Sequence, residues 1–173
     1  MNVLELFKPV KAFVFDVDGV LTDGTVLVMK GGLQARRMHI KDGFALQMAL
    51  KNGYSVKIIS GGNSPDVTDR LDKLGIKDIS MSVLDKKSFL LDYISANNFE
   101  KQQLLYMGDD LPDIPAMEIV GLPCCPADAV NEVKEIVQYI SPFNGGFTCV
   151  RDVIEKVLKL NGHWTYTTDI ASK

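Results

Sequence analysis

The chain has few of the residues that typify disulfide-rich or zinc-binding proteins. Its 173 residues include 3 cysteines and 2 histidines. An odd number of cysteines, two of them adjacent at Cys124 and Cys125, indicates reduced thiols, because vicinal cysteines rarely pair with each other. His39 and His163 supply too few further ligands for a zinc site beside these thiols. The sequence therefore argues against a disulfide framework and against structural zinc.

Strong charge and long apolar runs are lacking as well. The net charge is -3 and no dense basic run occurs, which argues against a nucleic-acid partner. The first 11 residues carry charges at Glu5, Lys8 and Lys11 without a long apolar stretch, unlike a signal peptide or a membrane span. We expect a cytoplasmic protein with no membrane partner.

The apolar pattern predicts one α/β domain over residues 1–173, because the length suits a single core. Strand-like and helix-like segments alternate, which favours a doubly wound, Rossmann-like parallel sheet. The predicted strands are Ala12–Phe15, Val56–Ser60, Ile79–Ser82, Leu104–Met107 and Gly121–Cys124. The predicted helices are Asp42–Asn52, Ser64–Leu74, Lys86–Asn97 and Leu111–Ile119.

Two segments depart from this alternation. Thr25–Met29 and Ala35–Ile40 are extended runs separated by a glycine pair, which predicts a β-hairpin insertion over about residues 25–40. The tail, about residues 162–173, has no helical period. It is either a frayed end or a segment that docks on a neighbouring subunit.

Two aspartates end the first predicted strand. Asp16 and Asp18 stand one residue apart and are followed at once by Gly19. Open α/β sheets place their ligand crevice at the carboxyl ends of strands. Two carboxylates this close raise each other's pKa unless a cation neutralises them, and Mg²⁺ is a suitable partner. The alternative is a strand end with two solvated aspartates.

Three further motifs follow in order. Ser60 ends the second long strand before two glycines, whose N–H groups could hold an anionic oxygen at a helix start. Lys86 opens a helix, where a lysine is electrostatically unfavourable unless it has another role, such as binding phosphate. A third strand ends in Asp109 and Asp110, with Asp113 close behind. Singly, the serine turn and the lysine are also typical of ordinary turns and solvated surfaces.

The ordered set of DxDG, serine, lysine and GDDxxD resembles the haloacid dehalogenase superfamily of phosphotransferases. The resemblance implies that Asp16 is the nucleophile, which takes the phosphoryl group as an aspartyl-phosphate. Asp18 is then the general acid for the leaving oxygen and afterwards the base for water. Ser60 and Lys86 hold phosphoryl oxygens.

The same resemblance implies a Mg²⁺ cofactor. Its ligands are Asp16, the backbone carbonyl of Asp18, and Asp109, and Asp110 or Asp113 supports these ligands. The stretches between the motifs are too short for a separate folded cap, so we expect the branch of the family without a cap domain.

Finer features resemble one capless family, the 3-deoxy-D-manno-octulosonate (KDO) 8-phosphate phosphatases. The matching segments run from Asp16 to Gly24 and continue through the hairpin and the catalytic motifs to Gly145, Gly146 and Arg151. The resemblance implies release of phosphate and KDO in lipopolysaccharide precursor synthesis. It also implies a homotetramer whose hairpins associate, with Gly145, Gly146 and Arg151 reaching a neighbour's site. The substrate-binding residues implied in this way are Asp18, His39, Ile40, Lys41, Asp42, Gly43, Gly61, Gly62, Arg70 and Lys86.

Two positions depart from that family. Gly62 stands where the family has an arginine thought to meet the sugar acid, and Lys41 replaces another arginine. A phosphatase for a nine-carbon keto sugar acid 9-phosphate, of the KDN or sialic acid type, is therefore the alternative. Outside the enzymes, a phospho-receiver domain has a different motif order. A noncatalytic assembly subunit has no support in the sequence, because all the catalytic residues are present.

Overall fold

The computed structural model describes residues 2–165 and 169–170, and its centre is a six-stranded sheet. The strand order is β5-β4-β1-β6-β7-β8, and every neighbouring pair is parallel. The sheet strands are β1 Ala12–Phe15, β4 Ser55–Ile59, β5 Asp78–Ser80, β6 Leu104–Met107, β7 Leu122–Cys125 and β8 Tyr139–Ile140. The doubly wound α/β fold expected from the sequence is confirmed.

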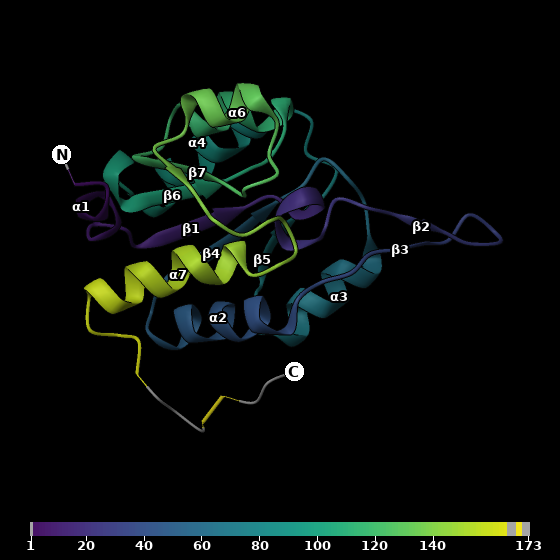
Figure 1. The fold of residues 1–173 in the computed structure, drawn as a ribbon, viewed down its shortest axis with the longest axis horizontal. Helices are drawn as coiled ribbons and strands as arrows, with labels where there is room; N and C mark the ends of the chain where they lie inside the picture. Colours follow the sequence, from purple (N-terminus) through teal and green to yellow (C-terminus); the bar gives the residue numbers. More distant parts are fainter. Residues whose placement is uncertain (1, 166–168, 171–173) are drawn as a thin grey trace.

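Helices cover both faces of this sheet (Figure 1). The helices are α1 Leu4–Phe7, α2 Ile40–Lys51, α3 Pro65–Lys73, α4 Lys86–Asn97, α5 Ile114–Met117, α6 Asn131–Ile136 and α7 Cys149–Leu160. Three further short helical segments are η1 Val17–Leu21, η2 Lys101–Gln103 and η3 Leu111–Asp113.

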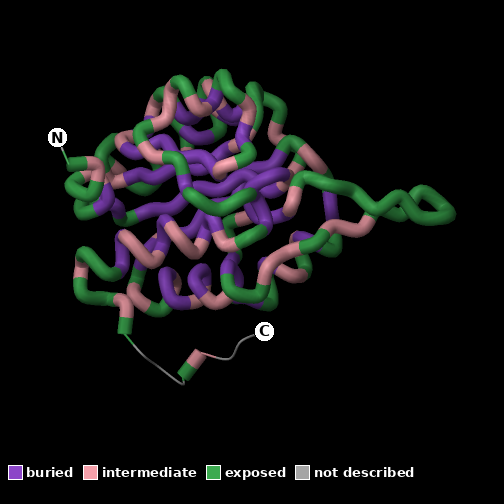
Figure 2. Tube along the Cα trace, viewed as in Figure 1, coloured by how far each residue is buried: buried purple, intermediate pink, exposed green. Residues whose placement is uncertain are grey.

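Strand β1 explains why there are two hydrophobic cores. Phe13 and Phe15 belong to the core formed with α2, α3 and α7, whereas Ala12 and Val14 belong to the core with α4, α5 and α6. Side chains of a strand alternate between faces, and all four residues of β1 are fully buried. Figure 2 shows the buried strands at the centre of the molecule. The aspartates that follow β1 are therefore attached to a strand that is buried on both faces.

The structure corrects the sequence prediction after β6. Residues Leu111–Ile119 do not form one helix, because η3 and the short α5 replace it. Pro112 and Pro115 explain the break, since proline lacks the N–H that a helix interior needs. Strand β8 and helices α6 and α7 were not predicted, although Val150, Val153, Ile154 and Val157 have helical spacing.

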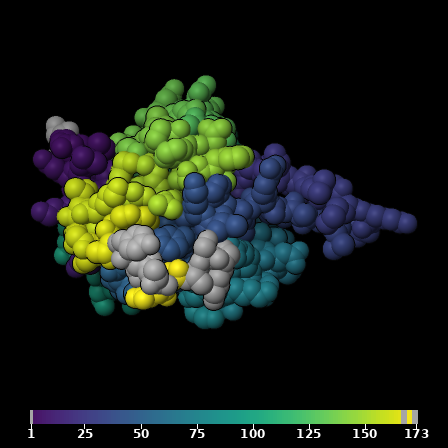
Figure 3. Space-filling model, turned by 60° about the horizontal axis from the view of Figure 1, so that its bottom comes forward, coloured from purple at the N-terminus to yellow at the C-terminus, as the bar shows by residue number. Residues whose placement is uncertain are grey.

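The predicted hairpin is present but shorter than expected. Its strands are β2 Leu27–Val28 and β3 Gln34–Ala35, paired antiparallel. The prediction that the second arm continues to Ile40 is wrong, because Ile40 begins α2 and Met38 pairs with Thr22 as an isolated bridge. Leu27, Val28 and Leu33 are 64%, 72% and 63% exposed. Figure 3 shows the hairpin as a narrow projection from the body of the molecule.

The described part of the tail packs on its own chain. The Tyr54 hydroxyl lies 2.9 Å from Nδ1 of His163, and Trp164 packs edge-on against Phe44. Asp169 accepts a hydrogen bond from Lys51. These contacts correct the expectation of a frayed end for residues 163–165 and 169–170, while residues 166–168 and 171–173 lie outside the described part. Across the described residues, the helices are too short or too polar to cross a lipid bilayer.

Candidate active site

The loop after β1 places Asp16 and Asp18 together at the carboxyl end of this strand. Asp16 is buried at the end of β1, and Asp18 lies within η1. The buried hydroxyl of Thr22 accepts the N–H of Gly19 at 3.3 Å and fixes the turn. Gly19 has a φ of +87°, and a Cβ there would lie 2.0 Å from Oδ2 of Asp109. A glycine must therefore follow Asp18, because no other residue leaves room for Asp109.

Ser60 stands beside this loop at the end of β4. It is 2% exposed, its N–H donates to the carbonyl of Ser80, and its hydroxyl accepts the N–H of Gly62 at 3.2 Å. The turn that follows is fixed by further backbone bonds, from Ser82 to Gly62 and from Val83 to Ser60. The serine hydroxyl and the turn amides are thus held in place by neighbouring backbone.

Lys86 lies in the first turn of α4 and bridges two buried carboxylates. Its Nζ lies 2.8 Å from Oδ1 of Asp16 and 2.7 Å from Oδ1 of Asp113. Burial alone lowers the pKa of Lys86, but the attraction of the two carboxylates outweighs burial and raises it. The ammonium group therefore stays charged at the base of the site. The helix itself is capped by Asp85, whose side chain accepts the N–H of Ser88.

Asp113 holds this arrangement together. Its Oδ1 also accepts a hydrogen bond from the Tyr106 hydroxyl at 2.8 Å, and its Oδ2 accepts the N–H of Asp109 at 3.1 Å. Both oxygens are thus occupied by protein donors, which suits a supporting role. The structure favours Asp113 over Asp110 for that role, because Asp110 is exposed and caps η3 by accepting the N–H of Leu111.

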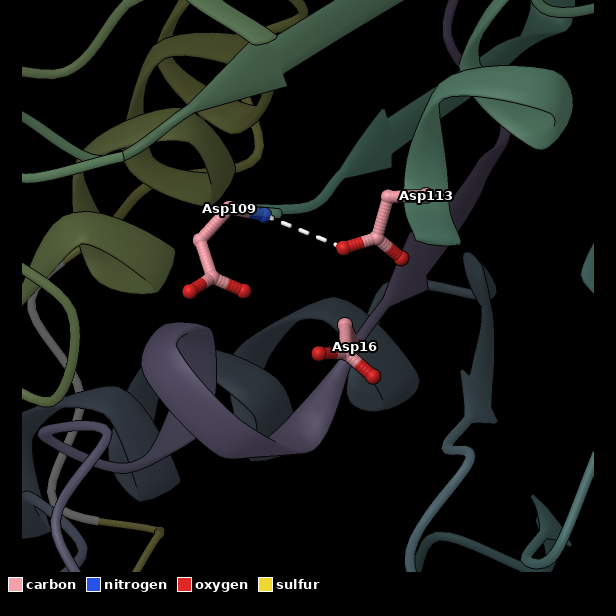
Figure 4. A group of neighbouring side chains, drawn as sticks. All are labelled: Asp16, Asp109 and Asp113. Atoms are coloured by element: carbon pink, nitrogen blue, oxygen red, sulfur yellow. Dashed lines mark hydrogen bonds between the residues drawn. The ribbon is translucent and has the colours of Figure 1, made fainter. Parts of the chain in front are cut away.

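Asp16, Asp109 and Asp113 form a group of carboxylates whose oxygens lie within 4.8 Å of one another. Figure 4 shows them converging from β1 and from the loop after β6. Burial and the neighbouring Asp113 raise the pKa of Asp16 to about 7, although Lys86 opposes this. Burial and the charges of Asp16 and Asp113 raise the pKa of Asp109 to about 7. One lysine does not balance this much negative charge.

These residues fit a hard divalent cation. The donors are carboxylate oxygens, which Mg²⁺ prefers, and one buried lysine faces the three carboxylates. Asp16 and Asp109 would hold the ion, and Asp113 would support them. When bound, Mg²⁺ would supply charge stabilisation at a phosphoryl oxygen.

The sequence motifs meet in one cavity of about 300 Å³. Predicted residues from four separate loops line it: Asp16, Asp18, Ser60, Gly61, Gly62, Lys86, Asp109, Asp110 and Asp113, together with Gly24 and Pro112. An acidic and partly buried cavity with one buried lysine and a serine turn can bind a metal ion together with an anionic ester.

A second cavity of about 380 Å³ adjoins the first one. It lies between the hairpin base and α3 and includes the predicted residues Ile40 and Arg70 together with Arg36. The two cavities adjoin because the Arg36 guanidinium donates to the carboxylate of Asp18, which lines the first cavity. Gly43 lies behind Arg70, since a Cβ at Gly43 would lie 3.3 Å from an Arg70 nitrogen.

Arg36 is a functional candidate that sequence patterns alone do not single out. In the sequence, residues Ala35–Ile40 form one arm of the predicted hairpin, and Arg36 and Arg37 are adjacent charges that look equivalent. In the structure they differ, because the Arg36 side chain is 9% exposed and that of Arg37 is 77% exposed. Sequence spacing contains no signal for this difference, since it depends on where β3 ends.

Other predicted residues lie away from the acidic cavity within one chain. His39 caps α2, and its Nδ1 accepts the N–H of Lys41. Lys41 lines a different cavity, of about 470 Å³, together with Arg151. Asp42 is 2% exposed and accepts the N–H groups of Arg151 and Thr148 at the start of α7. This internal role of Asp42 argues against the expectation that it contacts substrate, and burial raises its pKa to about 6.

Contacts within the same chain also explain why Gly145 and Gly146 are glycines. A Cβ at Gly145 would lie 1.9 Å from the carbonyl oxygen of Gly19, and one at Gly146 would lie 2.5 Å from the N of Asp23. The glycine pair thus lets the segment before α7 pack tightly on the loop that carries Asp18. The role of Gly145, Gly146 and Arg151 at a neighbouring subunit stays a prediction.

Comparison with known proteins adds independent evidence. Residues 72–154 match the family model of the haloacid dehalogenase-like hydrolases. The 3-deoxy-D-manno-octulosonate 8-phosphate phosphatase of Haemophilus influenzae is 31% identical over 153 residues, which cover 88% of this chain and 85% of that relative.

Solved structures agree with this result. The Moraxella catarrhalis enzyme of the same name, in complex with magnesium, phosphate and KDO, is 31% identical with a TM-score of 0.88, covering 92% of this chain and 91% of that one. The cobalt-bound Haemophilus influenzae phosphatase is 30% identical with a TM-score of 0.86, covering 91% of this chain and 92% of that one.

Proposed function

The chain belongs to the haloacid dehalogenase-like hydrolases and is a phosphomonoester phosphatase, and from that premise we propose that its substrate is KDO 8-phosphate. The observation that carries the proposal is the pair of adjoining cavities. The acidic cavity, with a metal ion bound, suits the phosphate, and the second cavity presents Arg70 to an anionic leaving group. The names of the relatives support the same substrate.

The proposed reaction has two halves. An Asp16 carboxylate oxygen attacks phosphorus, the bond from phosphorus to the sugar oxygen breaks, and Asp18 gives its proton to that oxygen. Water then attacks the aspartyl-phosphate and gives a proton to Asp18, which restores Asp16 and releases phosphate. Lys86 and the Ser60 turn hold the phosphoryl oxygens during both halves, and preorganised donors of this kind lower the barrier.

The proposal includes a homo-oligomer, most simply a tetramer, in the cytoplasm. A lone two-stranded hairpin is marginally stable in water, and Leu27, Val28 and Leu33 would be covered by association of hairpins. Gly145, Gly146 and Arg151 are proposed to lie at such an interface. The described cysteines, Cys124, Cys125 and Cys149, are free, which supports a reducing compartment.

A phosphate-release panel tests the substrate. The panel contains KDO 8-phosphate, a nine-carbon keto sugar acid 9-phosphate, and a sugar phosphate of similar length without a carboxylate. We expect the highest kcat/KM for KDO 8-phosphate, because substrate discrimination appears in that ratio. A preference for the nine-carbon acid would favour the alternative. Equal values for all three would overturn a sugar-acid substrate.

A further inference from the structure

Arg36 makes the most specific contact to Asp18 in the described structure. Its Nε donates to Oδ1 of Asp18 at 2.6 Å, and its Nη2 lies 3.4 Å from Oδ2. The Arg36 side chain is 9% exposed, whereas the Asp18 side chain is 41% exposed. A planar guanidinium fixes the orientation of a carboxyl group, which a single point charge does not. The contact to Oδ1 is the shorter of the two, so Oδ2 is held less tightly and is the oxygen suited to proton transfer.

The base of the hairpin is fixed although its tip projects. Thr22 pairs with Met38, and the Asp23 carboxylate accepts the N–H and the hydroxyl of Thr25. Arg36 lies between these anchors. Its guanidinium is therefore presented to Asp18 by a defined backbone, while Leu27 and Val28 farther out are exposed.

The space beside Oδ2 of Asp18 is kept open by Gly62. A Cβ at this position would lie 3.1 Å from Oδ2 of Asp18, closer than an ordinary van der Waals contact. Gly62 has no side chain, and so it leaves Oδ2 uncrowded on the side that faces the Ser60 turn. Arg36 holds Oδ1 of Asp18 more closely than Oδ2, and Gly62 leaves space beside Oδ2.

We propose that Arg36 is a positioning residue that orients the Asp18 carboxyl group for proton transfer to the leaving oxygen. The inference rests on the acid–base role of Asp18 in the proposed function. It assigns the hairpin base a part in catalysis that does not require contact between Arg36 and substrate. It also explains why Arg36 is buried beside Asp18 while its neighbour Arg37 is not.

The test compares two aryl phosphates of similar shape, p-nitrophenyl phosphate and phenyl phosphate. Neither carries a carboxylate, and nitrophenolate leaves readily without a proton whereas phenolate needs one. Values of kcat/KM report the first half of the reaction, so a slow second half does not interfere. For Arg36→Ala we expect the ratio of kcat/KM between the nitrophenyl and phenyl substrates to rise at least about tenfold, within the range typical of acid catalysis.

Four further variants sharpen the result. Arg36→Lys should raise the ratio less than Arg36→Ala does, because lysine keeps one charged donor. Gly62→Ala raises the ratio without removing any charge, which keeps the test valid should Arg36→Ala fail to fold. Arg37→Ala is the matched control on the adjacent residue and should leave the ratio unchanged. In an Asp18→Asn background, Arg36→Ala adds nothing, because residues that act as one unit are not additive.

Other results overturn the inference. Equal losses on both aryl phosphates, or no loss, would mean that Arg36 does not act through Asp18. A loss confined to KDO 8-phosphate would make Arg36 a carboxylate-binding residue instead. A raised ratio for Asp18→Asn but not for Arg36→Ala rejects this inference alone, whereas an unchanged ratio for Asp18→Asn rejects the acid role of Asp18 itself.

Discussion

Lys86 reaches Asp16 from a helix that begins 70 positions later in the chain, and its Nζ lies 2.8 Å from Oδ1. Both side chains are at most 9% exposed. Because they belong to separate sequence motifs, neither motif alone defines the site. The pair joins the amino end of α4 to the carboxyl end of β1. It therefore places a permanent positive charge beside the proposed nucleophile.

Replacing Lys86 is expected to cost both stability and activity. Lys86→Met leaves Asp16 and Asp113 buried without their partner, and breaking such a pair costs about 3–5 kcal/mol. Urea unfolding at pH 8, where the carboxylates would be ionised, measures this change, and phosphate release measures the loss of turnover. Lys87→Met is the matched control. Equal stability of the two variants would contradict the structural role of Lys86.

Asp16→Asn is expected to abolish turnover with an unchanged fold, because it removes the nucleophile but keeps the shape. Asp18→Asn is expected to lower kcat by roughly 10² to 10⁴, the usual range for a positioned acid–base. Steady-state assays with circular dichroism as the control for folding check both variants. Near wild-type turnover by Asp16→Asn would require direct attack by water in place of the covalent route.

The affinity for Mg²⁺ is expected to fall as the pH falls through about 7. The pKa values of Asp16 and Asp109 are raised to about 7, so protons compete with the cation below that pH. A raised acid pKa means that the folded state binds more protons than the unfolded chain between about pH 4 and 7. The metal-free protein therefore loses stability as the pH rises through this range.

Thermal unfolding with and without Mg²⁺ measures both effects. The increase in Tm that Mg²⁺ produces should grow from pH 6 to pH 8 and should be greatly reduced in Asp109→Asn. Exhaustive chelation should also remove the phosphatase activity. A Tm increase that does not depend on pH, or full activity after chelation, would mean that these carboxylates do not hold the ion.

Arg70 is expected to determine substrate choice. It lines the second cavity beside Arg36, so Arg70→Ala should lower kcat/KM for KDO 8-phosphate at least about tenfold more than for p-nitrophenyl phosphate, which lacks a carboxylate. Lys73→Ala is the control on the same helix, because Lys73 pairs with Asp69 at the surface. Equal losses on both substrates would remove Arg70 from that role.

The hairpin is expected to mediate assembly. Replacing the exposed Leu27 and Val28 by aspartate should dissociate the oligomer and lower activity together, because charge in an apolar interface is costly. Sedimentation at assay concentration measures the mass. Leu91→Asp changes another exposed leucine, on α4, and should leave the mass unchanged. A fully active wild-type monomer would contradict the proposed assembly.

Sequence patterns were enough to predict the parallel sheet and the four loops that meet at the candidate active site. An apolar run such as β1 must be buried on both faces, and its terminal aspartates must then leave at the edge of the sheet. Asp16, Ser60, Lys86 and Asp109 could be predicted because each directly follows or precedes a regular element. Helix α7 could also have been predicted from its apolar spacing, whereas the break at η3 depended on weighing Pro112 and Pro115 against an otherwise helical segment.

The contacts of individual side chains depend on how the folded elements pack together. Asp42 looked like a binding residue next to His39 and Lys41, but α7 packs against α2 and its backbone N–H groups occupy the Asp42 carboxylate. Arg36 could not be distinguished from Arg37 until the end of β3 fixed which of them points at Asp18. Such contacts join distant segments at distances of a few ångströms, and local sequence patterns contain no information on that scale.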